Sequence, residues 1–196
     1  DVTIDAGSKT LQLQSSHTIG SPSGIYAGNK KNVTVTAGKL NIITSGMTGG
    51  NSLTNGIWLD APANGASRIT IHAPTTNIAM TGGYGGNGIA IQKTDRWGEA
   101  SDAAAGTNKI TLDGNLNIKG ADSATWGIGL NPENVYSRFN NAGILTGVKN
   151  SEVEVKGLAN MDVYGNGITV NAAGSKVSIG GGTIHVPSGR NYGYYT

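Results

Sequence analysis

Cysteine is absent from this sequence of 196 residues. The chain therefore has neither a disulfide framework nor a thiolate metal site. This absence leaves the cellular compartment open, because secreted proteins do not require disulfides. Aromatic residues are also scarce, at 6% with a single Phe, and the apolar fraction of 37% is low for a compact helical core.

Charge and long apolar runs are lacking as well. Charged residues make up 13% of the chain, which is too few for a disordered polyampholyte. The net charge is +2 and the basic residues form no stripe, so no nucleic-acid partner is indicated. No apolar run approaches the ~18 residues of a membrane-spanning helix, and no signal peptide opens the sequence. If the protein is exported, we expect its targeting segment to have been removed.

Glycine (32 residues), Asn, Thr and Ser are plentiful, which is typical of short strands joined by tight turns. Three kinds of short segment recur. The first has an apolar-polar-apolar pattern and comprises Val2–Ile4, Val33–Val35, Ile69–Ile71, Ile110–Leu112, Val153–Val155 and Val177–Ile179. The second has the same pattern and comprises Leu11–Leu13, Leu40–Ile42, Ile78–Met80, Leu116–Ile118, Met161–Val163 and Ile184–Val186. The third is a glycine followed by an apolar residue, and it begins at Gly24, Gly56, Gly88, Gly127, Gly167 and Gly193.

The three segment types follow one another in a fixed order that is repeated six times. Alternation of apolar and polar residues is the period of a strand with one buried face. Antiparallel hairpins would not explain the fixed order, whereas a coil that returns to the same place on each turn does explain it. We therefore predict an all-β, right-handed, three-sheet parallel β-helix of about six coils with little or no helix, its hand following the general crossover preference.

Residues 1–196 are expected to form a single β-helix segment, since each coil of a solenoid contacts only its neighbours. Strand patterns continue to both ends of the sequence without a capping helix, which favours a segment of a longer rod. Tyr26 and Trp58 should form an outward aromatic pair on neighbouring coils, with Ile57 and Leu59 pointing inward. The third-sheet inward stack is expected to contain Ile25, Ile57, Ile89, Ile128, Ile168 and Tyr194.

Asn-Gly pairs precede three of the third strands. We expect their glycines to supply the positive φ angles that a tight corner needs. The three asparagines, Asn55, Asn87 and Asn166, would then stack and share side-chain hydrogen bonds.

Two long insertions interrupt the repeat, at Gln92–Lys109 and Asn131–Glu152. Both are predicted to leave the third strand of consecutive coils and to emerge side by side. Aromatic and basic residues within them are the candidate ligand-binding residues, because such side chains are common in recognition sites. These candidates are Arg96, Trp97, Tyr136, Arg138 and Phe139. The alternative is that the aromatics cover the backbone of their own loops.

Asn117, Asp162 and His185 are predicted to occupy equivalent outward sites on consecutive coils of the second sheet. Stacking would bring the Asp162 and His185 Cβ atoms to roughly 5 Å, and a carboxylate beside a histidine is able to do acid–base chemistry. The sequence offers no third partner for them, so we interpret the row as a surface ladder. Glu154 lies on a different predicted sheet from Asp162. No catalytic residue, metal ligand or cofactor is therefore assigned.

The V-T-V, L-N-I and N-G-I coils, rich in Gly, Asn and Thr and free of cysteine, resemble the passenger domains of bacterial autotransporters. The similarity spans essentially the whole chain and is closest to adhesins of the AIDA-like, self-associating type. It implies an extracellular right-handed β-helix at the bacterial cell surface, anchored in the outer membrane through a C-terminal barrel that this sequence lacks. No functional residue of the family transfers to a position of this chain.

The resemblance also implies the function. We expect a non-catalytic surface adhesin segment, a stiff monomeric rod whose partners are a host glycan or protein, or a neighbouring bacterium through self-association and biofilm formation. Two alternatives remain. One is a carbohydrate-active β-helix enzyme, a polysaccharide lyase or hydrolase, which would need clustered carboxylates on one outward sheet. The other is a trimeric fibre, which would need an apolar outer face.

Overall fold

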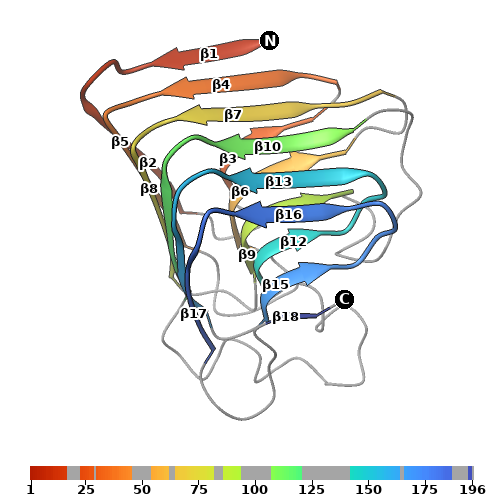
Figure 1. Ribbon diagram of the computed structural model, residues 1–196. Helices are drawn as coiled ribbons and strands as arrows, with labels where there is room; N and C mark the ends of the chain where they lie inside the picture. The colour runs from red at the N-terminus through yellow and green to blue at the C-terminus, as the bar shows by residue number, and fades with distance from the viewer. Residues whose placement is uncertain are drawn as a thin grey trace.

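The structure is a computed structural model, and it describes residues 1–16, 23–28, 30–45, 54–61, 65–81, 86–93, 107–120, 142–163, 166–186 and 194–195. Within these ranges every regular element is a β-strand. The strands form three six-stranded sheets, and all the pairs within each sheet are parallel (Figure 1). No helix capable of crossing a membrane occurs in the described part of the chain.

Each sheet takes one strand from every coil, which confirms the predicted three-sheet parallel β-helix of about six coils. The first sheet has the order β1 (Val2–Asp5), β4 (Asn32–Thr36), β7 (Arg68–His72), β10 (Asn108–Leu112), β13 (Ser151–Val155) and β16 (Lys176–Ile179). The second has the order β2 (Thr10–Ser16), β5 (Lys39–Ser45), β8 (Thr75–Thr81), β11 (Asn115–Lys119), β14 (Ala159–Asp162) and β17 (Gly182–His185). The third has the order β3 (Ser23–Ala27), β6 (Thr54–Asp60), β9 (Gly86–Gln92), β12 (Ala142–Thr146), β15 (Asn166–Val170) and β18 (Tyr194–Tyr195).

The core runs through the middle of the coils as rows of aliphatic side chains. In the first sheet Ile69, Ile110 and Val153 are in register, and none of the three is exposed. Ile57 and Ile89 form the corresponding row in the third sheet. β-Branched residues suit these positions because their restricted χ1 angles match the pleated surface of a strand. Every coil therefore adds one layer to the same continuous core.

The glycines of the third strands are required for a different reason from the one predicted. Gly24, Gly56, Gly88 and Gly167 lie within strands, and none of them has a positive φ angle. A Cβ on Gly88 would lie 2.5 Å from Ile118 Cδ1 and 2.7 Å from the carbonyl oxygen of Gly143. The third strand begins so close to the second sheet that only a residue without a side chain fits there.

The third strand of the fourth coil was predicted wrongly. Its residues are Ala142–Thr146, and Ile144 pairs with Ile89 on one side and Ile168 on the other. Ile144 thus takes the place predicted for Ile128, which is outside the described residues. The predicted insertion Asn131–Glu152 therefore overlaps two strands, and the long connection of this coil precedes its third strand instead of following it.

The other predicted insertion, Gln92–Lys109, agrees with the strands more closely. Gln92 is the last residue of β9, and Asn108 begins β10. The first insertion follows β9, a third-sheet strand, whereas the long connection of the next coil follows β11, a second-sheet strand. The prediction that both insertions leave equivalent positions and emerge side by side is therefore wrong.

The middle strands of the third sheet, β6, β9 and β12, are buried on their outer side as well as on their inner side. Trp58, Ala90 and Leu145 alternate with the core residues of β6, β9 and β12, yet they are 9%, 0% and 0% exposed. Together with Ala142 they form a second apolar cluster. The first and second sheets therefore supply the exposed outer faces of this part of the molecule.

The end coils bury their apolar residues less completely than the middle coils do. Val2 of β1 is 50% exposed although it is in register with the buried Val33. At the other end, Val177 and Ile179 of β16 are only partly buried. Each end coil has one neighbour among the described strands, whereas a middle coil has two.

Candidate functional site

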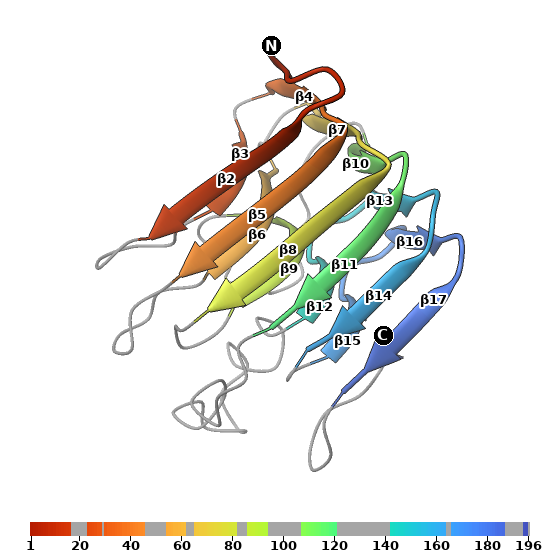
Figure 2. The ribbon, with the colours of Figure 1, turned by 90° about the vertical axis from the view of Figure 1, so that its left-hand side faces the viewer.

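A ladder of asparagine side chains crosses the outer face of the second sheet, which Figure 2 shows from outside. Asn77 Nδ2 donates to Asn41 Oδ1 at 2.9 Å, Asn117 Nδ2 donates to Asn77 Oδ1 at 2.8 Å, and Asn160 Nδ2 donates to Asn117 Oδ1 at 3.2 Å. The backbone N–H of Thr183 then donates to Asn160 Oδ1 at 3.3 Å. One side chain per coil thus continues the row across β5, β8, β11 and β14.

The ladder forms because parallel strands stack identical residues in register. Asn41, Asn77, Asn117 and Asn160 are consecutive register partners. An amide side chain carries both donors and acceptors, so each member is able to bond to the coil on either side. This arrangement satisfies the polar groups locally and holds the side chains at fixed positions along the stacking axis.

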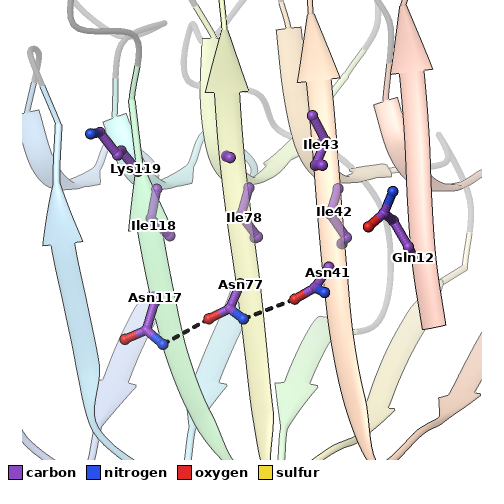
Figure 3. Close-up of a pocket in the computed structure, with 10 residues that line it drawn as sticks. Gln12, Asn41, Ile42, Ile43, Asn77, Ile78, Asn117, Ile118 and Lys119 are labelled. Atoms are coloured by element: carbon purple, nitrogen blue, oxygen red, sulfur yellow. Dashed lines mark hydrogen bonds between the residues drawn. The ribbon is translucent and has the colours of Figure 1, made fainter. Parts of the chain in front are cut away.

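A shallow hollow of about 360 Å³ lies beside the ladder (Figure 3). Its lining includes the amides of Asn41, Asn77 and Asn117 on one side. The side chains of the next outward row, Ile43 and Lys119, stand on the other side. The lining residues are Gln12, Asn41, Ile42, Ile43, Asn77, Ile78, Ala79, Asn117, Ile118 and Lys119.

The register of the second sheet differs from the predicted one by two residues at three strands, β8, β14 and β17. Asn117 pairs with Asn160, and Asp162 pairs with Lys119, so Asn117 is not in the row of Asp162 and His185. The prediction aligned strands by their apolar residues. In the structure a buried polar residue, Thr76, and a small one, Ala159, take inner positions, which displaces the apparent pattern.

Asp162 and His185 are neighbours at one end of the second sheet. They are register partners, and His185 Nδ1 lies 2.8 Å from Asp162 Oδ1. Both side chains are more than half exposed, at 55% and 66%. An exposed pair of this kind is screened by solvent and has no wall that would exclude water from a reaction.

The first sheet carries a network of charges on its later coils. Lys109 Nζ lies 2.7 Å from Glu154 Oε2 and 3.2 Å from Glu152 Oε1, and Lys176 Nζ lies 3.3 Å from the same Glu152 oxygen. The hydrogen bond to Glu154 is the main reason that the pKa of Lys109 is raised. Burial opposes ionisation of Glu152, but its bonds to Lys109 and Lys176 lower its pKa overall. The network therefore stabilises its own charged forms.

A second charged group lies at the end of the first-sheet strands. Lys156 Nζ is 2.8 Å from Asp113 Oδ1, and His72 Nδ1 contacts Asp113 Oδ2. The pKa of Asp113 is lowered mainly by its hydrogen bond with Lys156, and to a smaller extent by its hydrogen bond with His72. The acids of both charged groups are thus paired with cations. Among the described residues no group of three or more His, Asp or Glu side chains is arranged to hold a metal ion.

The asparagines of the third strands are buried and only partly stacked. Asn87 Nδ2 donates to Asn55 Oδ1 at 3.2 Å, as predicted. The row then ends, because Ala142 stands at this position in the fourth coil and its backbone N–H donates to Asn87 Oδ1 at 3.1 Å. Asn166 Nδ2 donates to Thr169 Oγ1 in its own strand.

The predicted aromatic pair is present on the third sheet. The ring centroids of Tyr26 and Trp58 are 5.3 Å apart, and the rings meet edge to face. The Tyr26 hydroxyl donates to Asp60 Oδ2 at 2.8 Å, and Trp58 Nε1 donates to the carbonyl oxygen of Gln92 at 3.4 Å. Tyr26 is 51% exposed, whereas Trp58 is nearly buried. The pair contributes to packing on the outer side of this sheet.

The predicted ligand-binding residues lie outside the described residues. They are Arg96, Trp97, Tyr136, Arg138 and Phe139. The asparagine ladder was not predicted as a row, although Asn117 was singled out. The sequence indicates the ladder only through an asparagine near the centre of four strands of the second sheet. These asparagines line up only when the strands are placed in the correct register.

Comparison of the chain with protein-family models, with curated protein sequences and with solved structures finds no match. The class of protein is therefore defined by its fold, which is a parallel β-helix with three sheets. Fold alone does not determine function in this class, so function has to be argued from the surface.

Proposed function

We propose that this chain is a non-catalytic adhesin segment, a stiff β-helical stalk that presents binding surfaces at a bacterial cell surface. The observation that supports this proposal most directly is the asparagine ladder on the second sheet. Its side chains are ordered by one another along the axis and are not gathered around a reaction centre. A rod with a regular polar face suits repeated, reversible contacts with another surface.

The charged residues support the same proposal. Glu152, Glu154 and Asp113 are each paired with a lysine, and together they form the two charged groups of the first sheet. A glycoside hydrolase needs one protonated carboxyl group as its general acid, whereas pairing with a lysine favours the ionised form. The pairing favours a structural role for these acids.

The test is a binding screen on immobilised glycans, matrix proteins and intact bacteria. The wild-type chain is compared with two variants in which the predicted contact residues become serine: Arg96 with Trp97, and Tyr136 with Arg138 and Phe139. We expect wild-type binding and a loss of at least about tenfold in affinity for one of the variants. Thr34→Ser, an outward change on the first sheet, is the matched control. Binding that both variants retain would show that these residues are not the contacts.

A carbohydrate-active enzyme is the second candidate, and the contact between Asp162 and His185 is the observation that favours it. The chain is incubated with pectin-like and other polysaccharides, and new reducing ends or unsaturated products are measured. We expect no turnover. Turnover that Asp162→Asn abolished would replace the adhesin proposal with the enzymatic one.

A further inference from the structure

We propose that the hollow beside the asparagine ladder binds an uncharged glycan chain. The hollow is the depression of about 360 Å³ on the outer face of the second sheet. This inference rests on the proposed function, because it names the ligand class that one face of the rod would hold. It assigns the contact to described residues of the β-helix itself, in β5, β8 and β11.

The hollow exists because one outward row contains a small residue. Ile43, Ala79 and Lys119 are consecutive register partners in this row. The methyl group of Ala79 leaves a gap between the longer side chains of Ile43 and Lys119, as Figure 3 shows for the two labelled residues. The neighbouring row, Asn41, Asn77 and Asn117, borders this gap along its length.

The amides of the ladder retain hydrogen-bonding capacity. Asn77 uses one N–H to reach Asn41 and one acceptor position to receive Asn117. An asparagine side chain has two N–H donors and two lone pairs on its oxygen. The row therefore presents a further donor and a further acceptor on each coil.

Within the ladder, Asn77 and Asn117 each keep one donor and one acceptor, and this balance favours hydroxyl groups as partners. A hydroxyl both donates and accepts, whereas a carboxylate or sulfate only accepts and would leave the second lone pair of each amide oxygen unused. Most of the surface of the hollow is apolar, and Ile43 and Ala79 contribute to it. A sugar ring with a C–H face and a rim of hydroxyls matches a site that combines apolar contact with a few polar groups.

The spacing of the ladder favours a chain of sugars over a single one. Equivalent amides recur once per coil, roughly 4.8 Å apart along the stacking axis. A linear glycan that runs across the strands meets another pair of donor and acceptor at each step. Several weak contacts on one ligand then act together and raise its overall affinity.

Nuclear magnetic resonance locates the contact directly on the wild-type chain. The probes are uncharged hexasaccharides of glucose, mannose and N-acetylglucosamine, and a sulfated hexasaccharide serves as the comparison. We expect at least one uncharged probe to shift the side-chain N–H signals of Asn41, Asn77 and Asn117 at millimolar concentration. Absence of shifts from every uncharged probe, or preference for the sulfated one, would overturn the inference.

Ala79→Leu fills the hollow without changing the core, since Ala79 is on the outer side of β8. We expect it to weaken binding of the selected glycan by about tenfold or more. Thr70→Leu is the matched control, because Thr70 is half-buried on the outward side of the first sheet in the same coil. Circular dichroism checks the fold of both variants. If Ala79→Leu does not fold, the nuclear magnetic resonance shifts of the wild-type chain alone test whether the glycan binds in the hollow. Unchanged affinity in a folded Ala79→Leu would contradict the site.

The outcomes separate this inference from the adhesin proposal. If the chain binds cells or matrix proteins but no uncharged glycan, the glycan site is wrong and the proposed function stands. If it binds a glycan whose signals map to residues other than the ladder, the function again stands and the site is wrong. If it binds none of the surfaces tested, both fail.

Discussion

At the scale of single residues, the repeated glycine of the third strand is a steric requirement. Gly56 and Gly88 stand where the chain passes close to the second sheet, and a Cβ on Gly56 would lie 2.4 Å from Ile78 Cγ2 of that sheet and 2.6 Å from the carbonyl oxygen of Gly88 in the next coil. Backbone atoms have little room to move away from such a contact inside a stack of coils. The repeated phrase therefore reflects the distance between two sheets, and not a turn conformation.

Gly88→Ala should destabilise the chain by about 1–3 kcal/mol, because the new methyl group would overlap Ile118 Cδ1 and the Gly143 carbonyl oxygen. Thermal and denaturant unfolding measure the change. Gly7→Asn is the control: Gly7 has a φ angle of 55° and open space around it, and Asn tolerates that conformation. Equal stability of Gly88→Ala and the wild type would disprove the steric explanation.

At the scale of the strands, the two exposed sheets differ in how their outer rows are stabilised. The second sheet uses neutral amides, from Asn41 to Asn160. The first sheet begins with threonines such as Thr34 and Thr70, which are register partners, and continues with charged side chains in β10, β13 and β16. The asparagine row of the second sheet therefore contains no titratable group, whereas the charged rows of the first sheet are expected to respond to pH.

Glu152 makes the pH response of the first sheet testable. Its pKa in the folded chain is below the ordinary value of 4.5, so its contribution is present above that pH and is lost as the pH falls through the folded pKa. At pH 7 we expect Glu152→Gln to lower stability by about 0.5–1 kcal/mol. This difference from the wild type should vanish in strong acid. Thermal melting curves of both chains, recorded from pH 7 down to strongly acidic pH, measure this difference in stability.

Asp5→Asn is the control for this experiment, since it removes an acid from the same sheet in the first coil. A deficit in Glu152→Gln that stays constant down to strongly acidic pH would mean that the loss is one of packing and not of charge. Lys109 gives the opposite pH dependence in the alkaline range, because its pKa is raised in the folded chain. Its contribution to stability is present below pH 10.5 and is lost as the pH rises through the folded pKa.

At the scale of the whole molecule, each coil is held only by the coils next to it. The core is continuous, but Ile4, Leu11 and Leu13 at one end and Val177, Ile179 and Ile184 at the other are only partly buried. A solenoid of this kind has a stability that is close to a sum over coils and their interfaces. The middle coils should therefore open least often.

Hydrogen exchange on the 196-residue chain tests this expectation. We expect the backbone amides of β7 and β8 to be the most protected, and those of β1 and β17 to exchange at least about tenfold faster, because an end coil opens by losing one interface and a middle coil by losing two. Uniform protection along the stack would show instead that all the coils open together.

The strand order and the interior were predictable because core rows repeat a clear alternation, as in Val33–Val35 and Ile110–Leu112. Register was not, wherever a polar or small residue such as Thr76 or Ala159 takes an inner place. The sequence pattern also could not separate Gly127-Ile128 from Gly143-Ile144, since both fit the third strand and only pairing with Ile89 distinguishes them. The asparagine ladder depends on register, so it was missed for the same reason.

The direction of the backbone hydrogen bonds determines how the rod would respond to a mechanical load. In all three sheets these bonds join one coil to the next, so they run along the stacking axis. Tension applied between the two ends pulls neighbouring coils directly apart. Such a load is expected to peel coils away from one end in succession, so that extension proceeds in steps and the coils that remain stacked keep their side-chain rows.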